Sequence, residues 1–513
     1  MSKPTACVAF GMTLWAWAGG PPAAAQAVPF SGTCDITRYG AVANDGGLDT
    51  TAVQAAIDAC AASGGGRVLV PPGRFVIGTI RLRSRLELHL QAGAILQGSS
   101  RIGDYPVLAN TRGDDHGAPR RLDAAVGSAD VAGVRALIVA EDTDGVALTG
   151  TGTIDGSGPA FWGEGFMESG RARPDQPRPR PWIWLRRATR VTVRDLLLTD
   201  SPSYGLTLDR CDDVFVSGLR IRNHPLSPNS DGIQVESSRN VRIVGVDIRT
   251  GDDAIVLKAG SGPVEHVLVT ASYLESDDAA FKFGTGSRFP ITHVRFADSV
   301  IARSRMGIAL FMKDGSEYSD FTASGIDIST SSRHATDYAV FVDVDRRTPD
   351  SPLGRIRDAT LRDLRIRTRG NLLIAGHPQA PLERIRLEGL DVSVAAPVDL
   401  ASLSGKPRGN ALLSPLPDSV DYARTDAHVT IAHVRDLSVT DVSVRGTTAA
   451  ASGARHAAWF LDVSGLRARG LRAGARSGGR AAFVTDGVAD VRVDGVEQGP
   501  ADGPLFLDVP ARR

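Results

Sequence analysis

The stretch that decides the fold runs from residue 229 to residue 258 and reads NSDGIQVESSRNVRIVGVDIRTGDDAIVLK. Within it, DGIQV and DAIVL match position for position, so Asp231 falls over Asp253 and Ser230 over Asp252, a step of 253 − 231 = 22 residues. A repeat of this length is too short for a βαβ unit and suits one coil of a β-solenoid. Equivalent residues of adjacent coils then lie about 4.8 Å apart. The sequence therefore predicts that Asp231, Asp252 and Asp253 come together.

The repeat continues along the chain. In the next segment, SDDAAFKF, Asp277 and Asp278 extend the pattern, with Asp278 placed 278 − 253 = 25 residues after Asp253, and a further step leads from Ala279 to Gly307. Later segments, such as VRIVGVDI and RIRLEGLDVSV, alternate aliphatic and polar residues, which turns one face of each strand toward a shared core. We expect an all-β solenoid from about residue 70 to residue 505.

Composition fits this fold and excludes two kinds of partner. Gly accounts for 56 of 513 residues, which favours many short strands joined by tight turns. Lys plus Arg and Asp plus Glu number 58 each, so the chain is close to neutral. Neither nucleic acid nor an anionic membrane is indicated as a partner. A solenoid grows by adding coils, so one long domain suits this length.

The first 27 residues have the pattern of a secretory signal peptide. One early Lys precedes an apolar run from Ala6 to Ala18, and the segment ends in Ala-Gln-Ala at position 27. The run is too short to span a bilayer, which needs about 20 residues. We expect export to the periplasm or outside the cell, with a mature domain at 28–513 and an N-terminal cap at about 28–72. An oxidising compartment would allow a disulfide between Cys34 and Cys60, and burial as free thiols is the alternative.

One helix and three long loops interrupt the strands. The helix is expected near Thr50–Ala62, because Val53, Ile57 and Cys60 share one face, and Asp49 or Thr50 can cap its start. It would cover the open end of the first coil. Loops are expected at 99–130, 156–181 and 397–426, and the first two are long enough to lie over a binding face.

The aspartate trio has three readings from the residues alone. A carboxylate cluster can bind Ca²⁺, carry out acid–base catalysis on a polar substrate, or cap turns. The adjacency of Asp252 and Asp253, beside Asp231 on the next coil, weakens the turn reading. Like charges about 5 Å apart raise the pKa of one member, so one carboxyl group can keep a proton while its neighbours stay ionised. An inverting glycosidase uses such a split between an acid and a base.

At these residues the chain resembles the family 28 glycoside hydrolases, the polygalacturonase group of right-handed parallel β-helix enzymes. The resemblance covers most of the chain, including GTGTIDGSGPAFW at 150–162 and RNHPLSPNSDGI followed by TGDDAIVLK. It implies a single-stranded right-handed parallel β-helix with a short N-terminal capping helix. It also implies that Asp252 is the general acid, that Asp231 and Asp253 activate the attacking water, and that neither a metal nor another cofactor is needed.

Two family motifs are missing. The coil that should carry Gly-His-Gly has Asp277-Asp278-Ala279 and no histidine, and the coil that should carry Arg-Ile-Lys has GIALFMK, with no arginine in phase. Because that Arg and Lys are associated with holding a galacturonate carboxylate, a substrate other than plain polygalacturonan is expected. Three lysines are predicted to form one column on successive coils. The candidate substrate-binding residues are Asn229, Asp277, Asp278, Lys258, Lys282 and Lys313.

The favoured function is therefore a secreted glycoside hydrolase acting on a polysaccharide or its oligosaccharides. Two alternatives remain open at this point. A β-helix polysaccharide lyase would use the aspartates to hold Ca²⁺ and a Lys or Arg to abstract the α-proton of a uronate. A glycan-binding solenoid would have no catalytic residues.

Overall fold

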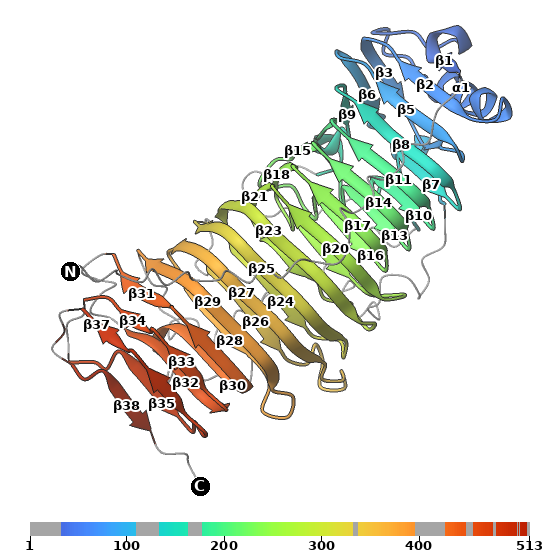
Figure 1. Ribbon diagram of the computed structural model, residues 1–513. Coiled ribbons are helices and arrows are strands. Elements are labelled where there is room, and N and C mark those ends of the chain that lie inside the picture. Colours follow the sequence, from blue (N-terminus) through green and yellow to red (C-terminus); the bar gives the residue numbers. More distant parts are fainter. Residues whose placement is uncertain are drawn as a thin grey trace, which may run out of the picture.

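The computed structural model describes residues 32–108, 133–162, 177–331, 337–395, 426–447, 455–475, 479–499, 501 and 503–509. The predicted signal peptide lies outside these residues, as do most of the loops expected at 99–130 and 397–426 and the middle of the loop expected at 156–181. Figure 1 shows a long ribbon of stacked strands, with the single α-helix of the described residues at its blue, N-terminal end. Every pairing between named strands is parallel, so the predicted parallel β-helix is confirmed.

Each coil contributes one strand to each of three stacks, named here A, B and C. Stack A contains β1 (Thr33–Asp35), β2 (Gly66–Val70), β5 (Leu86–Leu90), β8 (Asp144–Gly150), β11 (Thr189–Arg194), β14 (Asp212–Ser217), β17 (Arg239–Val244), β20 (Val264–Thr270), β23 (Ile291–Ser304), β25 (Glu317–Thr330), β27 (Arg355–Thr368), β29 (Leu382–Val394), β30 (Ala427–Thr440), β33 (Arg467–Arg469) and β36 (Arg492–Asp494).

Stack B contains β3 (Gly73–Ile77), β6 (Ala94–Gly98), β9 (Thr153–Asp155), β12 (Leu197–Thr199), β15 (Arg220–Arg222), β18 (Asp247–Thr250), β21 (Tyr273–Ser276), β31 (Ser443–Gly446), β34 (Arg472–Ala473) and β37 (Glu497–Gln498). The ends of the long strands β23 to β29 fill the middle of this stack.

Stack C contains β4 (Ile80–Arg81), β7 (Ile138–Glu141), β10 (Ile183–Arg186), β13 (Leu206–Asp209), β16 (Ile233–Glu236), β19 (Ile255–Lys258), β22 (Ala279–Phe283), β24 (Met306–Met312), β26 (Tyr338–Val344), β28 (Asn371–Ala375), β32 (His456–Ser464), β35 (Phe483–Asp486) and β38 (Phe506–Val509). The first part of β30 joins this stack between β28 and β32. Strands therefore begin at Thr33, within the expected cap, and end at Val509.

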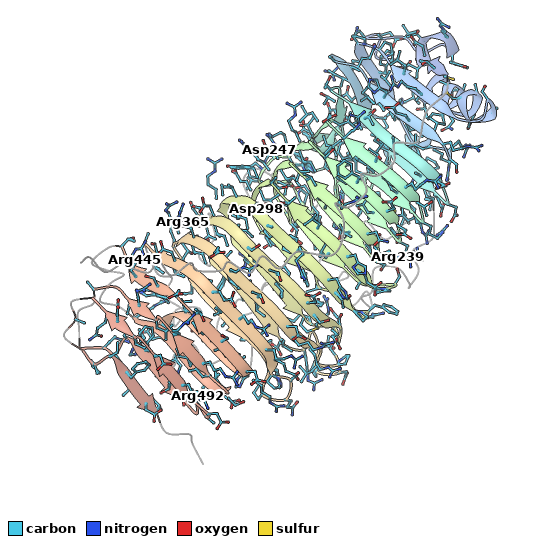
Figure 2. The ribbon with its side chains drawn as sticks, in the orientation of Figure 1. Arg239, Asp247, Asp298, Arg365, Arg445 and Arg492 are labelled. Carbon is cyan, nitrogen blue, oxygen red and sulfur yellow. The ribbon has the colours of Figure 1, made fainter. Side chains whose placement is uncertain are left out.

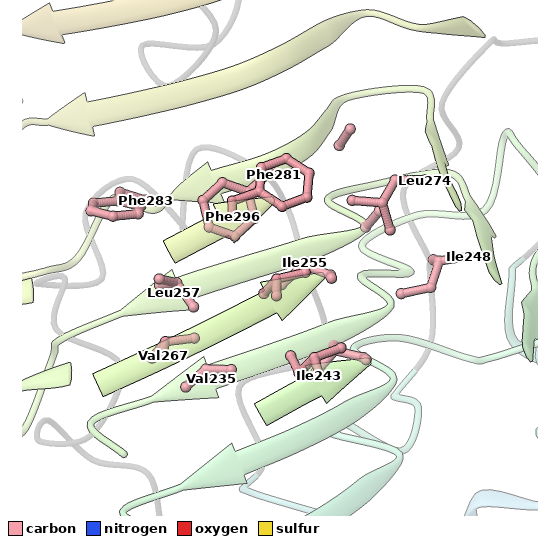
Figure 3. Close-up of a cluster of buried hydrophobic side chains, with 14 of the residues drawn as sticks. Val235, Ile243, Ile248, Ile255, Leu257, Val267, Leu274, Phe281, Phe283 and Phe296 are labelled. Atoms are coloured by element: carbon pink, nitrogen blue, oxygen red, sulfur yellow. The ribbon is translucent and has the colours of Figure 1, made fainter. Parts of the chain in front are cut away.

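The core is a column of apolar side chains enclosed by the three stacks. Figure 3 shows Val235, Ile255 and Phe281, from successive strands of stack C, meeting side chains from the other stacks. Phe281 stacks on Phe296 with ring centroids 4.5 Å apart, and the labelled residues are buried. Burial of each large aliphatic or aromatic side chain contributes about 1.5–3 kcal/mol. The aliphatic residues that alternate with polar residues in the sequence therefore point into this shared core, as predicted.

The predicted helix is confirmed at the N-terminal end as α1 (Thr50–Ala62), and Val53, Ile57 and Cys60 are buried on its inner face. Asp49 is its N-cap residue, and its backbone carbonyl accepts from the backbone N–H of Val53 at 2.9 Å, but its side chain makes no capping hydrogen bond. Its carboxylate accepts hydrogen bonds from the backbone N–H groups of Val42 at 2.9 Å and Val76 at 3.3 Å, which tie the cap to the first coils. Cys34 and Cys60 are free thiols rather than a disulfide. Short 3-10 helices lie at Ile36–Tyr39, Ile102–Asp104 and Gly158–Phe161.

Residues in the left-handed region mark the corner between stacks A and B. Asp298 (φ 48°), Gly325 (φ 65°), Asp363 (φ 52°) and Gly389 (φ 64°) follow one another on successive coils. A side chain on Gly325 would meet the Asp298 carboxylate at 2.8 Å, so each aspartate lies over the glycine of the next coil. Asp and Gly tolerate this conformation better than other residues. Figure 2 shows Asp298 and Arg365 along this edge, with Asp247 and Arg445 nearby on the same side.

The register differs by one residue from part of the sequence prediction. Ile233 pairs with Ile255, which confirms the 22-residue step. Ile255 pairs with Phe281, however, so the next step is 281 − 255 = 26 residues, and Asp278 stands over Asp252 rather than Asp253. Likewise Ala279 pairs with Met306, not Gly307. The prediction aligned Asp277-Asp278 with Asp252-Asp253. In the structure Phe281 and Phe283 point into the core, and a shift of one residue in the strand pairing would turn them outward.

Candidate active site

The candidate active site lies at the corner where the chain passes from stack B to stack C. Asp231 precedes β16, and Asp252 and Asp253 precede β19, the neighbouring strand. The backbone N–H of Gly232 donates to the carbonyl of Asp253 at 2.8 Å, so the ladder already joins the two turns. Asp231 and Asp253 therefore stand side by side, as the sequence predicts.

Two glycines explain why these turns pack so closely. A Cβ atom on Gly232 would lie 2.5 Å from the carbonyl oxygen of Ala254. On Gly251 it would lie 2.7 Å from the carbonyl oxygen of Ser227, with the carbonyls of His224 and Pro225 at 2.9 Å. Each distance is shorter than a real Cβ contact allows. The glycine after Asp231 and the glycine before Asp252 are thus required by the close approach of neighbouring backbones.

Buried polar groups fix the turn that carries Asn229 and Asp231. Ser230 bonds to the side chains of Ser227 and Thr250, and its Oγ accepts a hydrogen bond from the backbone N–H of Gly251 at 3.1 Å. Asn223 donates to Thr250 Oγ1 at 3.1 Å from the same cluster. Because every polar group named here is buried and hydrogen-bonded, the turn is held in one conformation.

Arg178 holds Asn229, and it lies at the described end of the loop expected at 156–181. Its guanidinium donates to Asn229 Oδ1 at 2.8 Å and to the carbonyls of Pro202 at 2.8 Å and Pro228 at 2.7 Å. Only 3% of Arg178 is exposed. Asn229 itself has a positive φ of 51°. The oxygen of the predicted substrate-binding Asn229 is therefore occupied by the protein, and this loop end supports the turn.

Asp231 is buried and has two polar neighbours. Gln234 Nε2 donates to its Oδ2 at 2.7 Å, and Lys258 Nζ lies 3.8 Å from the same oxygen. The ammonium of Lys258 also lies 5.0 Å from the centre of the Tyr204 ring. Burial opposes the charged form of Lys258, but Asp231, Tyr204 and Glu236 outweigh it and raise the pKa of this lysine. The geometry gives Asp231 a fixed orientation and a nearby positive charge.

Asp253 is also buried and bonds to Lys282, whose Nζ lies 3.0 Å from Asp253 Oδ1. The backbone N–H of Asp253 donates to Asp252 Oδ1 at 3.1 Å. Burial raises the pKa of Asp253 well above its ordinary value; Lys282 opposes this, and Asp278, Asp252 and Asp231 add to it. The charges that the sequence predicted to shift a pKa are present, and burial is the larger cause.

Asp278 joins the cluster from the next coil. Its Oδ1 accepts from Arg305 Nη1 at 2.9 Å, and its Oδ2 lies 3.5 Å from Lys282 Nζ. Asp277 stands on the same turn, where its backbone N–H donates to the carbonyl of Thr250 at 3.1 Å. Of the two predicted substrate-binding aspartates, the structure places Asp278 in direct contact with basic residues of the protein.

The three lysines do not form one column, and that prediction is wrong. Val256, not Lys258, pairs with Lys282, so these two lysines are offset by two residues along their strands. Lys282 pairs with Ala309, four residues before Lys313. Lys313 bonds to Asp343 and lies 3.6 Å from Asp345, away from the aspartate cluster. The offset has the same cause as the register error, because the inward Phe281 and Phe283 set the pairing.

Three carboxyl groups are close enough to share a cation. Asp252, Asp253 and Asp278 each offer an oxygen, and these oxygens lie within 4.8 Å of one another. The ammonium of Lys282 lies 3.0 Å from Asp253 Oδ1 and 3.5 Å from Asp278 Oδ2. Arg305 bonds to the other oxygen of Asp278, Oδ1. The protein thus supplies its own positive charges here, and we assign this position to the Lys282 ammonium.

Reasoning from the sequence did not identify Gln234, Arg178 or Arg305. Gln234 points to the outer face of β16, three residues after Asp231, and that spacing could have suggested it. Arg305 lies one coil after Asp278, because Met306 pairs with Ala279, so a correct register would have found it. Arg178 comes from a loop without periodicity, and no pattern in the sequence links it to Asn229.

Comparison with known proteins gives a consistent result. Residues 60–275 match the family model described as Glycosyl hydrolases family 28. A probable polygalacturonase of Vitis vinifera is 27% identical over 291 residues, covering 54% of this chain and 56% of the relative. An exo-poly-alpha-D-galacturonosidase of Dickeya chrysanthemi is 24% identical over 325 residues, covering 53% of this chain and 51% of the relative. The chain thus spans about half the length of these relatives, and about a quarter of others.

Solved structures share the fold. The hyperthermoactive exopolygalacturonase of Thermotoga maritima superposes with a TM-score of 0.60 at 18% identity, covering 71% of this chain and 87% of that one. The polygalacturonase of Erwinia carotovora gives a TM-score of 0.55 at 17% identity, covering 72% and 95%. At these identities the superpositions establish the parallel β-helix. The family-model match over residues 60–275 and the polygalacturonase relatives make this part of the chain similar to the family 28 glycoside hydrolases.

Proposed function

We propose that the protein is a glycoside hydrolase that cleaves a polysaccharide, or oligosaccharides derived from it, with inversion at the anomeric carbon. The observation that carries the proposal is the pairing of Asp231 and Asp253 on adjacent coils, with Asp252 beside them. In this mechanism Asp252 protonates the leaving oxygen, while Asp231 and Asp253 together deprotonate the attacking water. Of the substrate-binding residues predicted from the sequence, Asn229, Asp277 and Lys258 border the bound sugar in this mechanism.

Separation of the carboxyl groups bears on the stereochemistry. One oxygen each of Asp252 and Asp253 lies within 4.8 Å. This is shorter than the ~6.5–9.5 Å common between the carboxyl groups of inverting enzymes and closer to the ~5–5.5 Å of retaining enzymes. The inverting proposal therefore depends on Asp231, which approaches from the preceding coil, to hold the water together with Asp253.

A substrate other than unbranched polygalacturonate fits the basic residues of the site. The relatives named above are polygalacturonases. In this chain Lys258, Lys282 and Arg305 each face carboxylates of the protein itself. A cation that is already neutralised holds a substrate carboxylate less strongly, because part of its charge is compensated. We expect a neutral, rhamnose-containing or otherwise decorated pectic glycan to be cleaved faster.

The proposal includes export and a single catalytic unit. Removal of residues 1–27 would leave a β-helix glycosidase domain at 28–513, acting in the periplasm or outside the cell. Among the described residues no helix combines the length and the apolar character needed to cross a membrane. N-terminal sequencing of the protein from its native host should give Val28 as the first residue.

A panel of pectic glycans tests the proposed reaction. The protein is incubated with unbranched polygalacturonate, rhamnogalacturonan and decorated oligosaccharides, with and without a chelator. We expect new reducing ends, no ultraviolet-absorbing unsaturated sugar, and no effect of chelation. Unsaturated products that require Ca²⁺ would favour a lyase, and binding without products would favour a glycan-binding solenoid. Rates on unbranched polygalacturonate above those on every other glycan would refute the substrate proposal.

A further inference from the structure

Lys282 is enclosed by the aspartate cluster rather than open to the cleft. It projects from the outer face of β22, and only 12% of its side chain is exposed, compared with 23% for Lys258. Its Nζ lies 3.0 Å from Asp253 Oδ1 and 3.5 Å from Asp278 Oδ2, and 5.0 Å from the centre of the Phe311 ring. Asp253 lies on the turn before β19, Asp278 lies on the turn before β22, and Phe311 lies on β24. The ammonium is thus held on three sides.

A second ion pair fixes the first. Arg305 is 6% exposed and bonds to Asp278 Oδ1 at 2.9 Å, on the side of the carboxylate away from Lys282. Asp278 in turn is four residues before Lys282 on the same coil. The chain Arg305–Asp278–Lys282–Asp253 therefore alternates in charge across three coils. Paired buried charges of this kind are stable only when each has a partner, and removal of one leaves the next uncompensated.

The charge around Asp253 shows what Lys282 contributes. Asp253 faces Asp252 on its own turn, Asp231 on the preceding coil and Asp278 on the following coil. The cations in this group are Lys258 on β19, Lys282 on β22 and Arg305, which bonds to Asp278. Lys282 is the cation that hydrogen-bonds to Asp253. Without it, Asp253 would be a buried carboxylate among three others, and protonation would relieve the repulsion.

We propose that Lys282 is a positioning residue for the base, whose ammonium, fixed by Asp278 and Arg305, holds the Asp253 carboxylate ionised and aimed at the attacking water. This inference rests on the proposed function. It also gives Lys282 a role other than contact with substrate. The coil that has Asp277-Asp278 in place of the family's histidine then serves to fix the Lys282 ammonium. Lys282 then offsets part of the rise in the pKa of Asp253 that burial and the neighbouring carboxylates cause.

Two substitutions should move the pH–rate profile in opposite directions. Lys282→Met removes the positive charge and keeps a side chain of similar length. The acidic limb of the plot of kcat against pH should therefore shift upward by about 1–3 pH units. Asp278→Asn removes a negative charge and leaves Lys282 to Asp253 alone, so the limb should shift downward. A contact with substrate would instead raise KM for both variants with the limb unchanged. Arg303→Met, which breaks the exposed pair with Glu275 on neighbouring coils, is the matched control and should leave the limb in place.

A readout without substrate separates this inference from the proposed function. A carboxyl group with a raised pKa stabilises the fold below its unfolded pKa of about 3.9, and that contribution is lost as the pH rises through the folded value. For Asp253, the loss should extend to higher pH in Lys282→Met than in the parent protein. In Lys282→Met/Asp253→Asn this part of the pH dependence of Tm should disappear. Equal Tm profiles for Lys282→Met and the double variant would overturn the inference, even in a protein that hydrolyses no glycan tested.

Discussion

Two corners of the same β-helix use aspartate in different ways. At the corner between stacks A and B, Asp298 and Asp363 are exposed, have positive φ angles and lie over Gly325 and Gly389 of the next coil. At the corner between stacks B and C, Asp231, Asp253 and Asp278 are buried and face Lys258, Lys282 and Arg305. The first corner shapes a turn, and the second concentrates charge.

The comparison shows that residue type and repeat position do not by themselves identify a catalytic carboxyl group. Both corners recur once per coil; the first carries Asp298 and Asp363 on alternate coils, with a glycine between them, and the second carries aspartates on successive coils. Burial and cationic partners distinguish them, because a buried carboxylate without compensation is costly and persists where it has a function or a partner.

Removal of the base should have the largest effect. Asp231→Asn and Asp253→Asn should each lower kcat by about 10²–10⁴, the usual contribution of general acid–base catalysis. Asp298→Asn and Asp363→Asn, at the other corner, should change kcat less than twofold. Initial rates on the best glycan of the panel measure all four. Comparable losses at both corners would show that the distinction drawn here is wrong.

The acid should be distinguishable from the base by the leaving group. Asp252→Asn should lose most activity on a natural glycan, because the sugar leaving group needs a proton, and should retain more on an activated aryl glycoside. Asp253→Asn should lose activity on both substrates, since each needs the attacking water. Kinetics on the two substrates give the comparison. If Asp252→Asn and Asp253→Asn lose activity in the same ratio on both, the roles assigned to them are not supported.

Substitution of two glycines of the same coil, Gly232 and Gly245, should have different effects on activity. Gly232→Ala places a Cβ 2.5 Å from the carbonyl oxygen of Ala254, so the turn must shift and Asp231 with it. We expect at least a tenfold fall in kcat, together with a lower Tm. Gly245→Ala is the control, since Gly245 has a φ of 63° but open space around it. It should cost about 1–2 kcal/mol from the left-handed backbone alone and leave kcat unchanged. Full activity in Gly232→Ala would contradict the close packing of the two turns.

The smallest effect is expected at the exposed turn. Asp298 has a φ of 48°, and glycine occupies the equivalent position on the next coil as Gly325. Asp298→Gly should therefore leave Tm nearly unchanged, while Asp298→Ala should lower the free energy of unfolding by about 0.5–1 kcal/mol. Thermal unfolding of the two variants tests this. Equal losses would mean that the carboxylate, rather than the backbone conformation, stabilises the corner.

The sequence predicts the fold well, because aliphatic alternation and the 22-residue step reflect packing between adjacent coils. It also brings Asp231, Asp252 and Asp253 together correctly. The predicted register of Asp278 and of the lysines is wrong. Similar polar residues in two segments do not determine the strand pairing, which the packing of Phe281 and Phe283 in the core sets. Arg178 could not be found, since its contact with Asn229 joins a loop to a turn 51 residues later. Contacts that repeat with the coil are predictable, and contacts made by loops are not.

The configuration of the first sugar released tests the proposed mechanism. Nuclear magnetic resonance of the anomeric protons, recorded before mutarotation, distinguishes the two outcomes for any substrate that the protein cleaves. We predict the inverted anomer, because Asp231 and Asp253 direct water to the face opposite the leaving group and no covalent intermediate forms. A retained anomer would contradict this prediction and would make one member of the closely spaced Asp252 and Asp253 a nucleophile.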